Sequence, residues 1–116
     1  MFLLALLALL AACADPITTT TITDEGTACV DGDTITIAFP GCLSSSCDTL
    51  TSATCTATLD GDDVEIHAEA VIESQGRECT ADCGFITASC ELPAGGASLS
   101  YAGDTVTLAE ATCTSP

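Results

Sequence analysis

The chain has 116 residues and carries 17 acidic side chains against one basic side chain, so its formal net charge is −16 at pH 7. So negative a protein repels nucleic acid, and we expect no DNA or RNA partner. Val, Ile, Leu and Phe account for 19 of the 103 residues from position 14 to position 116. This share lies below the roughly 20% at which a highly charged chain is suspected of disorder. Something besides a large apolar core must therefore hold the fold together.

Residues 1–13 have the pattern of an export signal. An unbroken apolar stretch runs from Phe2 to Ala12, and Cys13 follows it. As a helix this stretch would rise about 16 Å, which is too short to span a bilayer and is typical of the apolar part of a signal peptide. No Lys or Arg precedes the stretch, although a basic start is usual in such signals.

The residues Leu10-Ala11-Ala12-Cys13 resemble the lipobox of bacterial lipoproteins, in which small residues precede a cysteine that becomes lipidated. The resemblance implies a signal peptide at 1–12, lipidation of Cys13 and a membrane anchor in the cell envelope. In Gram-negative lipoproteins, Asp directly after that cysteine keeps the protein in the inner membrane. Ala14 stands there in this chain, which implies the outer membrane, with the domain facing the periplasm or the cell surface. The alternative is an ordinary secretory signal in which Cys13 is incidental or disulfide-bonded.

The number of cysteines is nine, which is odd for an exported protein. If Cys13 carries lipid, the others can form four disulfides, each contributing about 2–4 kcal/mol in an oxidising compartment. Two cysteine pairs, 42/47 and 79/83, also have zinc-knuckle spacing, but export favours disulfides. Of about 105 connectivities, Cys55–Cys90 through the core and Cys29–Cys113 across the domain ends are our candidates. The eight disulfide candidates are Cys29, Cys42, Cys47, Cys55, Cys79, Cys83, Cys90 and Cys113.

The segment 13–28 is interpreted as the lipidated cysteine followed by a Thr-rich tether. From Asp15 to Ala28 it shows no helical period and little to bury. We therefore place a disulfide-rich domain at 29–116.

From Cys29 onward, apolar and polar residues alternate with the period of half-buried strands. The clearest case is 63–73, where Val64, Ile66 and Ala68 begin a row of apolar residues on one face. About six or seven short strands separated by turn signals predict an all-β fold, a small antiparallel sandwich stapled by disulfides. The predicted strands cover 33–39, 54–59, 63–73, 85–92, 97–102 and 105–108.

The arrangement of lipobox, cysteines and the stretch from Leu92-Pro93-Ala94-Gly95 to Tyr101 resembles small cysteine-rich lipoproteins of myxobacteria and related bacteria. That resemblance covers most of the mature chain. It implies an immunoglobulin-like sandwich and carries no agreed activity.

Residues with catalytic or metal-binding chemistry are few. There is no Gly-x-Ser-x-Gly elbow, phosphate loop or basic cluster, so we name no catalytic residue. Glu65, His67 and Glu69 share a strand face that we interpret as solvated, and no metal site is predicted there. A weaker alternative is calcium at two Asp-Gly loops, which are first of all turn signals. The carboxylates of those loops are Asp31, Asp33, Asp60, Asp62 and Asp63.

These observations predict an exported lipoprotein that is anchored to a membrane and acts as a structural or protein-interaction module, without catalysis or cofactor. Its expected partners are the membrane, through the N-terminal lipid, and a protein, met through a sheet edge. The alternative function is a calcium- or cation-binding β-sandwich module that uses the acidic loops. An enzyme with unrecognised residues is the third and weakest hypothesis.

Overall fold

The computed structural model describes residues 16–76 and 78–114, so the predicted export signal and Cys13 lie outside the described residues. Eight strands and no helix occur in the described part of the chain. None of these residues forms a helix long and apolar enough to cross a membrane. The strands are β1 (Thr18–Thr23), β2 (Thr27–Asp31), β3 (Thr34–Ala38), β4 (Asp48–Asp60), β5 (Asp63–Ser74), β6 (Thr87–Glu91), β7 (Ser98–Tyr101) and β8 (Asp104–Thr107).

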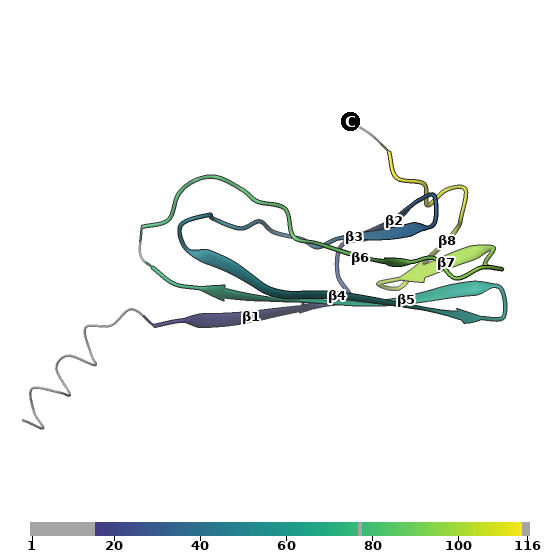
Figure 1. Ribbon diagram of the computed structural model, residues 1–116, viewed down its shortest axis with the longest axis horizontal. Helices are drawn as coiled ribbons and strands as arrows, with labels where there is room; N and C mark the ends of the chain where they lie inside the picture. The colour runs from purple at the N-terminus through teal and green to yellow at the C-terminus, as the bar shows by residue number, and fades with distance from the viewer. Residues whose placement is uncertain (1–15, 77, 115–116) are drawn as a thin grey trace, which may run out of the picture.

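The strands form two sheets that face each other (Figure 1). In the five-stranded sheet, β5 is central: β4 pairs along one edge, β1 and β7 share the other edge, and β8 pairs with β7. The three-stranded sheet has the order β2-β3-β6. The predicted all-β sandwich is thus confirmed, with eight strands in place of six or seven. The purely antiparallel expectation was wrong at one pair, because β7 runs parallel to β5.

The core lies between the sheets and follows the predicted alternation. On β5, the exposed fractions are 0% for Val64, 3% for Ile66 and Ala68, 0% for Ala70 and 9% for Ile72. From the opposite sheet, β3 adds side chains at positions 35 and 37, both 0% exposed. Inward residues at every second position are what a sheet with one buried face requires.

Four disulfides join all eight cysteines from Cys29 to Cys113. The two pairings suggested by the sequence, Cys29–Cys113 and Cys55–Cys90, are both present. The first attaches the C-terminal segment to β2, and the second links β4 to β6 across the two sheets. The other two bridges, Cys42–Cys83 and Cys47–Cys79, connect the loops before β4 and before β6. With every one of these sulfurs in a disulfide, the zinc-knuckle alternative was wrong.

The interpretation of 15–28 as a tether was wrong for most of its length. Thr18 to Thr23 form β1, which pairs with β5 in a register that runs from Thr18↔Ser74 to Thr23↔Glu69. β2 begins at Thr27. Threonine is stiff at its branched Cβ and fits an extended strand, and the neighbouring strand supplies the backbone hydrogen bonds that a tether would take from water. The folded domain therefore starts at Thr18.

Candidate functional site

The outer face of the five-stranded sheet presents polar side chains in register. On β5, Glu65, His67 and Glu69 are exposed. Each lies beside a threonine of β4, in the pairs Thr58↔Glu65, Thr56↔His67 and Thr54↔Glu69. Across β5, Thr23 of β1 also pairs with Glu69. This face is therefore a carboxylate row flanked by short hydroxyl side chains, the solvated strand face expected from the sequence.

The outer edge of β4 is the longest strand edge without a backbone pairing partner in the described part of the molecule. β4 has 13 residues and, among the described residues, pairs with β5 alone. Its register shifts between Leu50 and Ser52 and is continuous from Ser52 to Asp60. Between Asp48 and Asp60 it carries no charged residue and no proline. Charged residues and proline normally protect an edge strand from pairing with another chain.

By contrast, the outer edge of β2 is covered by the C-terminal segment. The Val30 N–H donates to the Ala111 carbonyl at 2.8 Å, and the Cys113 N–H donates to the Val30 carbonyl at 2.9 Å. The disulfide Cys29–Cys113 fixes this segment in place. One sheet thus has an edge closed by its own chain, while the other sheet leaves β4 open.

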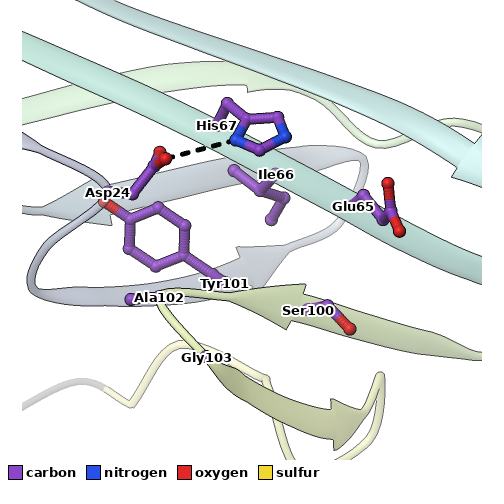
Figure 2. A pocket seen from close by; sticks show the side chains of 8 residues that line it. All are labelled: Asp24, Glu65, Ile66, His67, Ser100, Tyr101, Ala102 and Gly103. Carbon is purple, nitrogen blue, oxygen red and sulfur yellow. Dashed lines mark hydrogen bonds and ion pairs between the residues drawn. The ribbon is translucent and has the colours of Figure 1, made fainter.

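A gap between β1 and β7, which share one edge of β5, is closed by Asp24 (Figure 2). The backbone N–H of Asp24 donates to the Ala68 carbonyl at 2.9 Å. Its carboxylate accepts the Ala68 N–H at 2.8 Å and lies 3.2 Å from Nδ1 of His67. The Ala68 N–H lowers the pKa of the Asp24 carboxyl, burial opposes this, and His67 adds to the lowering. Asp24 therefore satisfies the backbone N–H and carbonyl of Ala68, which no neighbouring strand pairs at this point.

The chain then crosses from one sheet to the other at Gly26. A Cβ on this glycine would meet the Ala38 carbonyl oxygen at 1.9 Å, and its φ is +91°. Only glycine fits such a backbone this close to a neighbouring strand. Next to this glycine in the chain, the Glu25 carbonyl accepts a hydrogen bond from the Tyr101 hydroxyl at 2.7 Å. Burial raises the pKa of the Tyr101 phenol, and the negative charge of Asp24 adds to the effect.

A depression of about 470 Å³ lies beside Asp24 and Tyr101, and Figure 2 shows the side chains that line it. Asp24, His67 and Tyr101 all line it. The Ser100 hydroxyl, which also lines it, donates to Asp63 at 2.8 Å. His67 is 71% exposed, so its pairing with Asp24 is open to water. The hydrogen bonds in the depression join strands to one another, which gives it a structural role.

The acidic loops lie at hairpin turns, as their Asp-Gly dipeptides predicted. Asp31 and Asp33 flank Gly32 between β2 and β3, and the turn between β4 and β5 contains Asp62. Asp63 accepts hydroxyl hydrogen bonds from Ser98 and Ser100, at 2.7 Å and 2.8 Å, and so fastens β7 beside β5. Within 16–76 and 78–114, no three His, Cys, Asp or Glu residues gather in a way that would hold a metal ion.

The loops joined by Cys42–Cys83 and Cys47–Cys79 hold a second set of polar contacts. The Ser44 N–H donates to Asp48 at 2.7 Å, the Ser44 hydroxyl donates to the Thr80 carbonyl at 2.9 Å, and the Thr80 hydroxyl donates to Asp82. Hydrogen bonds from Ser45 and Thr80 lower the pKa of Asp82 to about 2. These contacts hold the two loops together.

Sequence reasoning missed the roles of Asp24, Asp63 and Tyr101. The sequence pattern places Asp63 among candidate calcium ligands and Asp24 in the tether. Comparison of the chain with protein-family models, with curated proteins and with solved structures gives no match. A proposal about function must accordingly rest on the predicted export signal, the disulfides and the unpaired edge of β4.

Proposed function

We propose that this protein is a membrane-anchored lipoprotein of the cell envelope that presents its β-sandwich as a structural or protein-interaction module and performs no catalysis. The proposal includes the family resemblance: a lipobox at Leu10–Cys13, an immunoglobulin-like arrangement and the stretch from Leu92 to Tyr101, as in small lipoproteins of the myxobacterial type. It also includes the outer membrane as the site of anchoring, because Ala14 follows Cys13.

The observation that carries the proposal is the complete use of the other cysteines. Four disulfides account for all eight cysteines from Cys29 to Cys113. Multiple disulfides indicate an oxidising, extracytoplasmic location. Of the nine cysteines in the chain, Cys13 is the one without a partner in these bridges. A lipid on its sulfur explains both its position after a signal-like stretch and the odd number of cysteines.

The early start of β1 supports a close attachment to the membrane. Four residues, 14–17, separate Cys13 from Thr18, and they can span at most about 14 Å when extended. Thr18 pairs with Ser74 at the end of β5. That end would face the membrane, and the turn between β4 and β5 would lie about 36 Å farther out, because a strand rises about 3.3 Å per residue. β4 would then run roughly along the membrane normal, and its unpaired edge would face sideways, parallel to the membrane surface.

Metabolic labelling with palmitate tests the anchor. We expect the full-length chain, expressed in a bacterial host, to incorporate label and to fractionate with membranes, whereas Cys13→Ser incorporates none. A thiol count on the folded protein under non-reducing conditions serves as the control, and it should find no free thiol among the eight disulfide cysteines in either form. Label on Cys13→Ser, or no label on the unaltered chain, would contradict the proposal.

A further inference from the structure

We propose that the β4 edge accepts an extended, basic segment of a partner protein, which adds to the five-stranded sheet as a further strand. This inference rests on the proposed function as an interaction module and names the chemistry of its partner. The segment from Ser52 to Asp60 keeps a continuous register with β5 on one side. On its other side, every second residue directs its backbone N–H and carbonyl outward, which is the template used in strand addition.

The charge on the sheet selects a basic occupant. Thr54 and Thr58 of β4 lie between the open edge and the carboxylates of Glu69 and Glu65. An added strand would lie about 4.8 Å from β4 and so about 9.6 Å from β5. Because threonine is short, a Lys or Arg side chain of the added strand can extend over it and meet a carboxylate from β5. An acidic segment, or a second copy of a chain with net charge −16, would be repelled.

The spacing of the carboxylates defines a sequence pattern for the partner. Glu65 and Glu69 are four residues apart on one strand face, with His67 between them. Positions i and i+4 of the added strand therefore face carboxylates, and position i+2 faces the imidazole, where a neutral side chain fits best. The intervening positions point to the other face of the sheet.

Other strand edges in the described residues suit this role less well. β1 has six residues and starts beside the proposed anchor, and β8 has four. β4 combines the greatest length with an uncharged interior from Thr49 to Leu59. Its disulfide at Cys55 fixes it to β6 of the opposite sheet, which holds the edge ready before a partner binds.

A synthetic peptide tests the proposal directly. The probe is the capped, dye-labelled heptapeptide Val-Lys-Val-Thr-Val-Lys-Val, and the control peptide, Val-Lys-Lys-Thr-Val-Val-Val, has the same composition with its lysines on opposite faces. Binding to the oxidised full-length chain is measured by fluorescence anisotropy at low salt. We expect the patterned peptide to bind at least about tenfold more tightly, and its affinity to fall as salt rises.

A matched pair of variants distinguishes binding at the β4 edge from general attraction to the negative charge of Glu69. Thr54→Lys and Thr23→Lys each put one lysine beside Glu69, from β4 and from β1 respectively. We expect Thr54→Lys to weaken binding of the patterned peptide at least about tenfold and Thr23→Lys to change it less than about threefold. Thr58→Lys, opposite Glu65, repeats the test if a thermal melt shows that Thr54→Lys is unfolded.

Several results would overturn the proposal. These are equal binding of the two peptides, equal loss in the two variants, absence of binding, or a stable dimer of the unaltered chain that occupies the edge instead. The peptide measurement does not require a lipid, and the protein can be taken from membranes or from the soluble fraction. Failure of the palmitate test would therefore reject the anchor, and failure of the peptide test would reject the basic partner.

Discussion

The two ends of the sandwich are stabilised by different interactions (Figure 1). At the end with the turn between β4 and β5, here the packed end, Ile35, Val64 and Leu99 belong to the apolar core, with exposed fractions of 0%, 0% and 2%. At the opposite end, here the cystine end, the loops 39–47 and 75–86 are joined by Cys42–Cys83 and Cys47–Cys79 and by hydroxyl and carboxylate hydrogen bonds.

This difference shows how a chain with few large apolar residues can fold. In the middle of β5, before Ile72, the core contains the small residues Ala68 and Ala70, which bury little surface at roughly 25 cal/mol per Å². Disulfides stabilise through the unfolded chain instead and need no large side chains. The apolar core reaches both ends, because Ile72 and Ile86 are also buried, while covalent links between loops occur at the end from which the proposed anchor extends.

The largest expected effect comes from removing a bridge of the cystine end. Cys47 and Cys79 are 32 residues apart, so the double variant Cys47→Ser/Cys79→Ser should lose about 4 kcal/mol of unfolding free energy by loop-closure entropy. Urea unfolding measures the loss. Hydrogen exchange should rise first at the paired amides of Leu43 and Gly84 and last at Val64. A uniform rise along β5 would show that the two ends do not differ in this way.

The parts of this fold that could be predicted from sequence are those specified locally. The alternation from Asp63 to Glu73 predicted β5 because a period of two needs no knowledge of the partner strand. Cys55–Cys90 could be proposed because both residues lay on inward faces. In contrast, Thr18–Thr23 has uniform polarity, and its strand character depends on an edge of β5 far along the chain. The parallel pairing of β7 is likewise non-local.

The site was less predictable than the fold. Asp24 acts through a positive φ of 50° and through contact with Ala68, 44 positions away. A sequence pattern carries neither fact. The open edge of β4 is also a property of the assembled sheet, because whether a strand has one neighbour or two depends on topology. The Asp-Gly turns were predictable because that dipeptide favours the turn locally.

A smaller effect is expected from truncating the packed core. Ile35→Ala removes a fully buried side chain and should cost about 3 kcal/mol, within the range of roughly 2–5 kcal/mol for such changes. Leu50→Ala, at a half-buried position on β4 toward the cystine end, should cost about 1 kcal/mol because less surface and a smaller cavity are involved. Urea unfolding of both variants measures the two losses of unfolding free energy. Similar losses would show that the half-buried Leu50 contributes as much to stability as the fully buried Ile35.

The smallest effect concerns acid and the cystine end. The pKa of Asp82 is lowered from 3.8 to about 2 by the hydroxyl groups of Ser45 and Thr80. A carboxyl whose folded pKa is depressed stabilises the native state above its unfolded pKa, and that contribution is lost as pH falls from about 3.8 toward 2. Protonation of the other carboxylates also relieves repulsion in this acidic chain, so the unaltered protein must be compared with Asp82→Asn. The difference between their urea midpoints should be largest above pH 4 and should shrink as pH approaches 2. A difference that stays constant across this range would show that the ionised carboxylate of Asp82 does not help to hold the cystine end together.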